Sequence, residues 1–224
     1  MARACVERLR HALGFAREWG WAGVDATRGA RLPRRQKRER VLVDVELELL
    51  FTNLNRTAHP HTRRAARTLA ATGLRVAEVC RLRGNDLDER RGRVWIAKAK
   101  AGPRWAPVGA SMLEQLVSWR IDTGFLFRTK SGRPLDPRTL RRALARASAL
   151  AGIEKVVPHH LRHTFASRAL LAGVPVHVVA ALLGHSCPTV TLRTYAHVIG
   201  GDVSEAADRI AGDLLGLLTG KVGA

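Results

Sequence analysis

Four separated segments of the chain contain residue types that can bind or attack a phosphate group. The first is Thr72-Gly-Leu-Arg75, with Glu78 three residues further on. Arg75 follows a glycine turn at an expected helix start, where backbone amides and a guanidinium can together bind an anion. Glu78 falls on the same helix face and can orient the arginine. An ordinary surface ion pair would show the same short pattern.

The second segment is an expected β-hairpin with basic residues around its tip. Residues 93–98 are typical of one strand and residues 104–108 of its partner. Lys98, Lys100 and Arg104 lie along this hairpin. A hairpin lysine is mobile, and its pKa shifts readily near other cations, which suits a general acid. Most hairpin lysines are only solvated, so this pattern is also weak by itself.

The third segment, Pro158-His159-His160-Leu161-Arg162-His163, combines histidines with an arginine. On a helix, His159, Arg162 and His163 share one face, because positions three and four apart are neighbours. Three histidines also raise the possibility of a metal site. The spacing differs from the His-Glu-x-x-His of zinc hydrolases, and the motif contains no carboxylate. An arginine among the supposed ligands favours an anion instead.

The fourth segment is Leu182-Leu-Gly-His185-Ser186, which is followed by Tyr195, the only tyrosine of the chain. A phenol can attack a phosphodiester and hold it as a phosphotyrosine ester, which conserves the bond energy for rejoining. A lone tyrosine is more often a packed or surface residue. The fourth segment therefore indicates a nucleophile only in combination with the other three segments.

Composition indicates a polyanionic partner. The 224 residues include 38 Lys plus Arg against 19 Asp plus Glu, a formal net charge of +19. Nucleic acid is the usual partner of such a surface, although ribosome-associated proteins and products of GC-rich genomes are basic too. Cys5, Cys80 and Cys187 form no CxxC pair, which argues against a disulfide framework or a zinc ribbon. We find no secretory signal or membrane-spanning run, and expect a cytoplasmic protein.

The pattern of apolar residues predicts a mainly α protein with one small antiparallel β-sheet (α+β). Residues 28–40 contain proline, glycine and many basic residues, and are typical of a linker. Asp44, Ser111 and Asp136 are expected helix caps. The expected helices are 4–19, a stretch after Asp44 that carries Leu47, Leu50 and Phe51, 61–71, a stretch after Arg75, 111–119, 137–151, 160–172, 175–184 and 202–218.

The four segments together closely resemble the tyrosine recombinase (phage integrase) family. The order and the spacing match over about residues 40–200. The short pieces are unspecific individually, but their joint occurrence is highly specific. The resemblance implies the catalytic-domain fold of that family. The matching set consists of Thr72-Gly-Leu-Arg75-x-x-Glu78, Lys98, His159-x-x-Arg162-His163, Leu183-Gly184-His185-Ser186 and Tyr195.

The resemblance also implies roles for these residues. Arg75 and Arg162 would bind the nonbridging phosphate oxygens and stabilise the charge that develops in the transition state. His159 and His185 match histidines that hydrogen-bond the phosphate or accept the tyrosine proton. Tyr195 would attack the phosphodiester, giving a 3′-phosphotyrosine and a free 5′ hydroxyl.

The remaining members of the set would assist this reaction. Lys98 would be the general acid for the departing 5′ oxygen, with Lys100 on the same strand face as its rival. Glu78 and His163 would be supporting groups that hold the arginine and the helix. Family members need no metal and no nucleotide cofactor, and we find neither a Gly-x-x-x-x-Gly-Lys loop nor an acidic cluster for two-metal catalysis.

The expected partner is double-stranded DNA. An apolar stripe on the expected last helix, Val203, Ala207, Ile210, Leu214 and Leu217, either packs on its own core or docks on a neighbouring protomer of a homo-tetramer on DNA. The basic residues between 138 and 146 either contact DNA or form a solvated helix face. The candidates for DNA contact are Arg34, Arg35, Lys37, Arg38, Lys100, Arg104, Arg138, Arg141, Arg142 and Arg146.

The chain departs from the family pattern at its N-terminal side. Integrases usually carry a complete helical core-binding domain before the catalytic domain, and about 40 residues are too few for one. We expect residues 1–40 to be a remnant helix of that domain plus a basic linker, and residues 41–224 to be the catalytic domain. The expected function is site-specific recombination or integration. The alternatives are a non-catalytic DNA-binding remnant and a type IB topoisomerase.

Overall fold

The computed structural model describes residues 2–24, 26–27, 29, 40–99, 102–120, 124–185, 187–199 and 211. The chain forms two compact units, Met1–Arg38 and Glu39–Ala224. In the first unit, α1 (Ala2–Glu18) confirms the helix that the sequence predicts. The basic candidates Arg34, Arg35, Lys37 and Arg38 lie outside the described residues.

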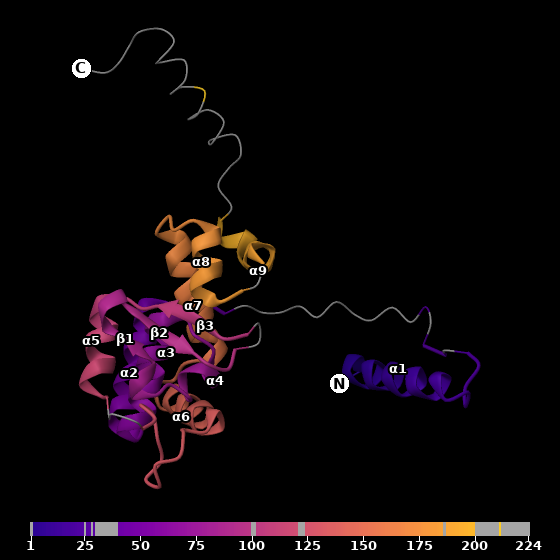
Figure 1. The fold of residues 1–224 in the computed structure, drawn as a ribbon, viewed down its shortest axis with the longest axis horizontal. Helices are drawn as coiled ribbons and strands as arrows, with labels where there is room; N and C mark the ends of the chain where they lie inside the picture. Colours follow the sequence, from indigo (N-terminus) through magenta and orange to yellow (C-terminus); the bar gives the residue numbers. More distant parts are fainter. Residues whose placement is uncertain are drawn as a thin grey trace. The chain divides into compact units, whose positions relative to one another are not determined.

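The second unit is mainly helical, as Figure 1 shows. Its central contacts join α2 to α6 and α3 to α7, while α8 and α9 pack on each other and on α7. None of the helices in the described part of the chain is long and apolar enough to cross a membrane. The helices are α2 (Asp44–Thr57), α3 (Pro60–Thr72), α4 (Val76–Val79), α5 (Ala110–Ser118), α6 (Pro137–Leu150), α7 (Pro158–Leu171), α8 (Val176–Leu183) and α9 (Pro188–Ile199).

A small antiparallel sheet lies beside α5, in the order β1-β2-β3. The strands are β1 (Leu87–Asp88), β2 (Arg93–Ile96) and β3 (Arg104–Pro107). In the register of β2 and β3, Ile96 faces Arg104, so the hairpin tip begins directly after Ile96. The predicted hairpin and the predicted fold class, mainly α with a small antiparallel sheet, are confirmed.

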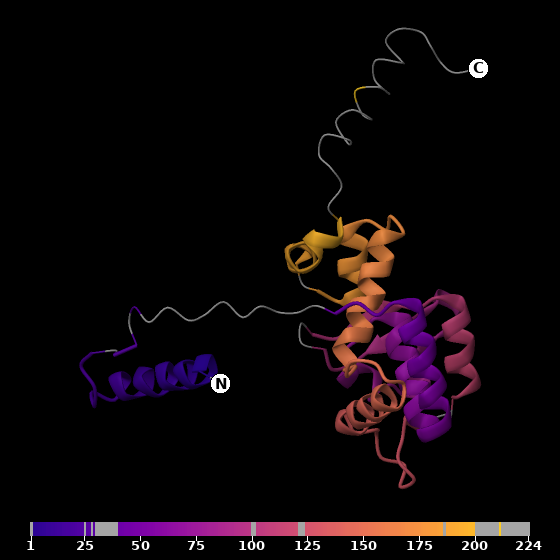
Figure 2. The ribbon, with the colours of Figure 1, turned by 180° about the vertical axis from the view of Figure 1, so that it is seen from behind.

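Two groups of buried side chains position the helices. The larger core includes Leu50 and Leu54 of α2 and Leu140 and Leu144 of α6. The two leucines of each helix are four residues apart and lie on one face of it, and α2 and α6 pack on each other. A smaller group joins Ala166 of α7, Val179 and Leu183 of α8, and Tyr195 of α9. This second group fixes the three C-terminal helices to one another (Figure 2).

Helix caps follow the sequence in one case and depart from it in two. The Asp136 carboxylate accepts a hydrogen bond from the Arg138 amide at 2.7 Å, so the predicted cap of α6 is confirmed. At α2 the cap is Val43, because the Glu46 carboxylate accepts a hydrogen bond from the Val43 amide. Asp44 is the first helical residue.

The cap predicted at Ser111 is also wrong. The cap of α5 is Gly109, whose carbonyl accepts hydrogen bonds from the Met112 and Leu113 amides at 3.0 Å. Ser111 therefore lies inside the first helical turn.

The sequence missed one helix. Residues 188–199 form α9, although Thr189, Val190 and Thr191 lower the intrinsic tendency of its first turn to be helical. Packing against α8 and α7 overrides that tendency, because it buries Thr191 and Tyr195 completely or nearly so. The predicted helix over 202–218, with its apolar stripe, lies outside the described residues except for residue 211.

Gly73 allows α3 to end against α7. It caps α3 in the left-handed conformation at φ 63°, and a Cβ placed there would lie 2.4 Å from Cδ1 of Phe165. Leu183 of α8 would be the next contact, at 3.0 Å. Only glycine combines this backbone conformation with so close an approach.

We expect Gly73→Ala to lower the free energy of unfolding by about 2–5 kcal/mol, from left-handed strain plus overpacking. Gly132→Ala is the matched control, because Gly132 has φ 75° and open space around it. It isolates the strain, about 1–2 kcal/mol. Chemical denaturation of both variants measures the difference. If both variants lost the same free energy of unfolding, the close contact with Phe165 would not contribute to the effect of Gly73→Ala.

Candidate active site

Arg75 lies where α3 and α4 meet, and its guanidinium is held on two sides. Nη1 donates to Oε1 of Glu78 at 3.1 Å, and Nη2 donates to the carbonyl of Gly184 at 3.2 Å. The Arg75 amide donates to the other oxygen of Glu78, which makes Arg75 the N-cap of α4. Glu78 therefore holds both the amide and the guanidinium of Arg75. The arginine side chain is half-buried, and the carboxylate is almost fully buried.

Arg162 projects from α7 into the same region and is buried. Its Nη1 donates to the Gly73 carbonyl at 2.7 Å and its Nη2 to the Leu183 carbonyl at 2.8 Å. Burial, followed by the charge of Arg75, lowers the pKa of Arg162 to about 10, so it remains a cation at neutral pH. Arg75 and Arg162 therefore bind adjacent carbonyls, those of Gly184 and Leu183, at the end of α8.

Arg104, the first residue of β3, is the third guanidinium at this place. Its Nη1 and Nη2 donate to the two oxygens of Glu78 at 3.0 and 3.2 Å. Burial alone would favour the neutral acid, but hydrogen bonds from Arg104 and Arg75 hold the pKa of Glu78 below its usual value. We call Arg75, Arg104 and Arg162 the arginine cluster. Three guanidiniums face one carboxylate, so the cluster has a surplus of positive charge.

His185 lies against the arginine cluster in its neutral form. Its Nε2 is 3.0 Å from Nη2 of Arg162, and its Nδ1 is 2.7 Å from the Thr191 hydroxyl. A guanidinium only donates, so Nε2 accepts and the ring proton is on Nδ1, facing Thr191. Burial, together with the charges of Arg162, Arg75 and Arg104, lowers the pKa of His185 to about 4.

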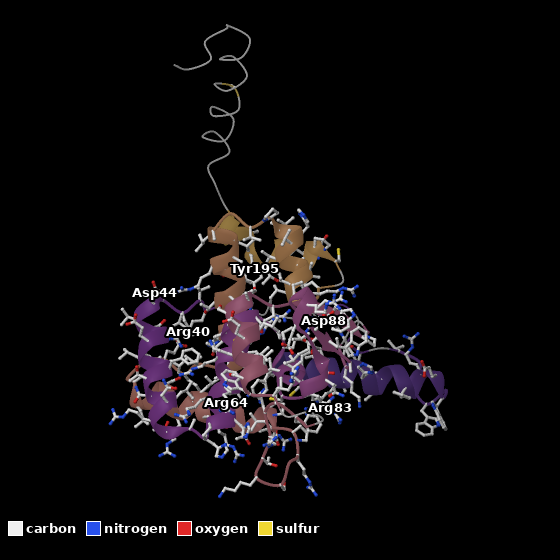
Figure 3. The ribbon with its side chains drawn as sticks, turned by 60° about the vertical axis from the view of Figure 1, so that its left-hand side comes forward. Arg40, Asp44, Arg64, Arg83, Asp88 and Tyr195 are labelled. Atoms are coloured by element: carbon white, nitrogen blue, oxygen red, sulfur yellow. The ribbon has the colours of Figure 1, made fainter. Side chains whose placement is uncertain are left out.

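Tyr195 is buried in α9, where the C-terminal helices meet the rest of the unit (Figure 3). Its hydroxyl shares a 2.8 Å hydrogen bond with Nδ1 of His163, a buried residue of α7 next to Arg162. The tyrosine is also near enough to Arg162 for its ionised form to raise the pKa of that arginine. The only phenol of the chain is thus held by His163, the residue after Arg162.

His159 is the exposed member of the α7 motif. Its ring packs edge-on against His163 at 4.1 Å between centroids, one turn closer to the start of α7. His159, Arg162 and His163 therefore share one helix face, as the spacing predicts. Among the described residues, no three potential metal ligands converge.

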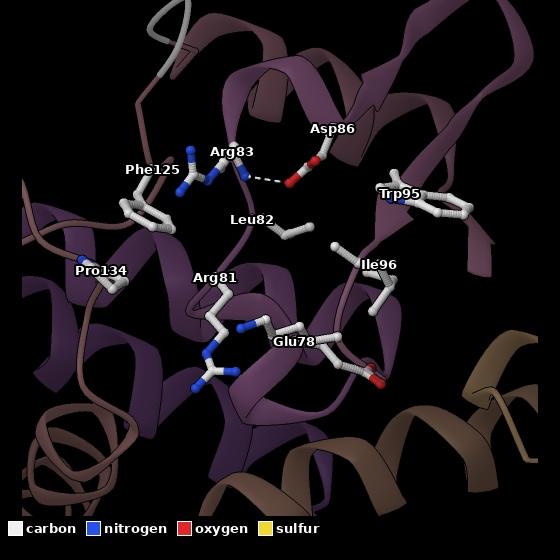
Figure 4. Close-up of a pocket in the computed structure, with 11 residues that line it drawn as sticks. Glu78, Arg81, Leu82, Arg83, Asp86, Trp95, Ile96, Phe125 and Pro134 are labelled. Atoms are coloured by element: carbon white, nitrogen blue, oxygen red, sulfur yellow. Dashed lines mark hydrogen bonds between the residues drawn. The ribbon is translucent and has the colours of Figure 1, made fainter. Parts of the chain in front are cut away.

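Lys98 follows β2 on the exposed side of a pocket of about 420 Å³. Glu78, Arg81 and Trp95 also line this pocket, and Figure 4 shows Glu78 and Arg81 next to each other at one end of it. The pocket connects the surroundings of Lys98 with the carboxylate that holds Arg75. Lys100 lies outside the described residues.

The basic candidates on α6 are separate from this region. All of them are exposed on the helix surface, where either DNA or water can contact them. They are Arg138, Arg141, Arg142 and Arg146.

Sequence patterns did not show three of these contacts. Thr191 binds His185, the Gly184 carbonyl binds Arg75, and the Arg104 guanidinium binds Glu78. A signal for the last was present, because Arg104 and Glu78 are opposite charges beside the other motifs. The last two pairs are far apart in sequence and become neighbours only when β3, α4 and α8 meet.

The chain belongs to the phage integrase family. The family model, described as "Phage integrase family", matches residues 40–200. The chain is 34% identical to the tyrosine recombinase XerA of Pyrococcus furiosus over 149 residues, which is 63% of this chain and 51% of that protein. It is also 34% identical to the tyrosine recombinase XerC of Corynebacterium glutamicum, covering 63% of this chain and 48% of that one. The chain thus spans about half the length of these curated relatives.

Solved structures show the same fold. A lambda integrase dimer bound to a core site matches with a TM-score of 0.70 and 21% identity, over 84% of this chain and 73% of that one. The XerA recombinase matches with a TM-score of 0.59 and 24% identity, over 82% and 66%. The predicted resemblance is therefore confirmed, and the fold is that of tyrosine recombinase catalytic domains.

We expect the His185 imidazole to titrate with a midpoint at about 4, because burial and the arginine cluster oppose its charge. Its NMR resonances, assigned with His185→Gln, measure this midpoint directly. A midpoint near 6.5 would contradict the neutral, Nδ1-protonated form.

The same shift determines a stability effect. The folded pKa lies below the unfolded value of 6.5, so this contribution to folding is present above pH 6.5 and is lost as pH falls toward 4. His185→Gln should remove that part of the acid-dependent loss, which denaturation at pH 7 and pH 4.5 compares.

Proposed function

We propose that this chain is the catalytic part of a site-specific DNA recombinase or integrase that cuts and rejoins strands through Tyr195. The observation that carries the proposal is that Arg75 and Arg162 bind adjacent carbonyls at the end of α8, while the buried Tyr195 hydroxyl is hydrogen-bonded to His163, the residue after Arg162. Relatives named tyrosine recombinases and structural neighbours described as bound to DNA support it.

Two members of the arginine cluster, Arg75 and Arg162, supply the electrostatic stabilisation. Arg75 and Arg162 hold a phosphate through its nonbridging oxygens, and their charge has its greatest effect as the pentavalent transition state develops negative charge. The Gly73, Leu183 and Gly184 carbonyls fix the guanidiniums before DNA arrives, so little reorganisation accompanies the reaction.

Tyr195 supplies the nucleophile. Its hydroxyl rests on His163 in this structure, and attack requires α9 to turn the oxygen toward the phosphate. The phenol proton passes to a neighbouring histidine, His159 or His163, while the surrounding cations favour the phenolate. The new bond joins the tyrosine oxygen to phosphorus as a 3′-phosphotyrosine, and the bond to the 5′ oxygen breaks.

His185 orients Arg162 in this scheme. It accepts a hydrogen bond from the Arg162 guanidinium and is itself fixed by Thr191. A bound phosphate offsets the repulsion that lowers the pKa of His185, so the imidazole can then act as a hydrogen-bond donor to the phosphate.

Lys98 supplies the proton to the departing 5′ oxygen, with Lys100 as the alternative donor. Lys98 is exposed at the hairpin and lines the pocket that also contains Glu78. Rejoining reverses the steps, when a 5′ hydroxyl of another strand attacks the phosphotyrosine. The chemistry uses only side chains of the chain itself.

The proposed partner is double-stranded DNA in the cytoplasm, bound by a homo-tetramer. A groove of about 380 Å³ with apolar walls from Leu47, Ala70, Phe165 and Ala169 lies between α2, α3 and α7. Its proposed occupant is the apolar stripe of residues 202–218 of a second copy. The exposed arginines of α6 are the proposed contacts to the DNA backbone.

We expect wild-type protein to form a covalent adduct with a nicked duplex carrying its cognate site, and Tyr195→Phe to form none, because the phenylalanine has no attacking oxygen. Denaturing electrophoresis with labelled DNA measures the adduct. Tyr195→Phe should retain salt-dependent DNA binding, since it leaves the arginine cluster unchanged.

The outcomes of that experiment separate the alternatives. Binding without an adduct from the wild type would indicate a DNA-binding remnant. Relaxation of supercoiled plasmid without site preference would indicate a topoisomerase. Either result would overturn the recombinase proposal.

We expect Lys98→Ala to slow cleavage by about 10²–10⁴-fold on ordinary DNA, the usual contribution of a general acid. On DNA with sulfur at the 5′ bridging position, the rate should return close to that of the wild type, because a thiolate leaves without protonation. Lys100→Ala is the matched control. Rescue of Lys100→Ala instead of Lys98→Ala would assign the proton donor to Lys100.

A further inference from the structure

Arg104 occupies a place that neither the catalytic scheme nor the sequence pattern explains. Both of its terminal nitrogens bind Glu78, as a two-pronged contact at 3.0 and 3.2 Å. Its side chain is 18% exposed and that of Glu78 only 2%. Both terminal nitrogens are therefore already bound to a carboxylate, unlike those of an exposed arginine whose role is general contact with DNA phosphates.

The hydrogen bonds of Glu78 show what Arg104 does to Arg75. A carboxylate has about four lone-pair sites. Here the two oxygens accept four bonds, two from Arg104 and two from the side chain and amide of Arg75. Because Arg104 takes the two-pronged face, Arg75 makes a single guanidinium bond to Glu78. The rest of the Arg75 guanidinium is directed elsewhere, with Nη2 toward the Gly184 carbonyl.

Charge balance also indicates that Arg104 limits the pairing of Arg75 with Glu78. Without Arg104, Glu78 would be a buried carboxylate with half of its hydrogen bonds missing, and Arg75 is the nearest cation to compensate it. A full Arg75–Glu78 ion pair would cancel the charge that Arg75 offers to a phosphate. With Arg104 present, the cluster retains a surplus of positive charge while Glu78 remains fully bonded.

Gly184 provides an independent sign that the structure is built around Arg104. A Cβ at Gly184 would lie 2.3 Å from Nε and 2.4 Å from Cζ of Arg104, so the guanidinium packs directly on the glycine backbone. Nε of Arg104 is buried there and makes no hydrogen bond to any described residue. An unsatisfied buried donor is destabilising, and its retention points to a functional reason for this orientation.

Arg104 also connects the arginine cluster with the hairpin. It begins β3 and faces Ile96, the last residue of β2, two positions before Lys98. The side chain of Arg104 therefore links the β2–β3 hairpin directly to Glu78.

We propose that Arg104 is a positioning residue: by occupying the two-pronged face of Glu78, it limits Arg75 to a single guanidinium bond with that carboxylate and keeps the guanidinium aimed at the scissile phosphate. This inference rests on the proposed function. Arg104 itself does not touch the phosphate. Its loss therefore lowers the rate of cleavage and leaves DNA affinity nearly unchanged.

The test measures single-turnover adduct formation at saturating protein, together with DNA affinity over a range of salt concentrations. Arg104→Lys, which keeps the charge but loses the two-pronged geometry, should cleave about ten- to a hundredfold more slowly than the wild type. Its affinity and salt dependence should match the wild type. Arg93→Lys is the matched control, because Arg93 lies in the same sheet and pairs with Asp88 outside the cluster. It should cleave at the wild-type rate.

A second substrate distinguishes positioning from a general structural defect. In a methylphosphonate, a methyl group replaces one nonbridging oxygen and removes the negative charge that Arg75 binds. The difference between wild type and Arg104→Lys should then shrink to within about threefold. Thermal unfolding shows whether each variant is folded, and Arg104→Met provides a second, uncharged variant of similar length.

The results separate failure of this inference from failure of the proposed function. No adduct from the wild type would remove the proposed function itself. A wild-type adduct together with normal cleavage by Arg104→Lys and Arg104→Met would overturn the role of Arg104 alone. So would a loss explained fully by weaker, less salt-dependent binding, or an equal loss on phosphate and methylphosphonate substrates.

Discussion

The burial of a carboxylate among guanidiniums is the constraint around which this unit is organised. Cations brought together out of water repel one another, and each loses hydration. Glu78 offsets part of that repulsion, and carbonyls at the ends of α3 and α8 accept one hydrogen bond from Arg75 and two from Arg162. The helices must therefore end where they do. Both ends are glycines in the left-handed conformation, Gly73 and Gly184, and the carbonyls of these glycines hold Arg162 and Arg75.

The same constraint explains why one histidine is neutral and one tyrosine is buried. His185 meets Arg162 as a hydrogen-bond acceptor, and only the neutral imidazole can accept. Tyr195 belongs to a small apolar group with Val179 and Leu183, yet its hydroxyl reaches His163 on α7. The C-terminal helices thus bury the phenol and bring its hydroxyl to His163, the residue after Arg162.

Sequence reasoning was most successful where a local rule decides the outcome. The cap at Asp136 followed from an aspartate before a proline, and the common face of His159, Arg162 and His163 followed from helical spacing. It failed at Ser111 and Asp44, where a neighbouring residue caps the helix. It also missed α9, whose β-branched first turn depends on packing against α8 and α7.

The sequence by itself determined the fold class and the family, because the four motifs and their order are properties of the chain, and the family model matches its residues 40–200. It also determined which side chains are chemically able to act. Only the tertiary structure decided their partners. Arg104 and Glu78 are separated by 26 positions, and His163 and Tyr195 by 32. No local pattern links such residues, because their distance depends on how separate elements pack, and hydrogen bonding acts only over about 3 Å.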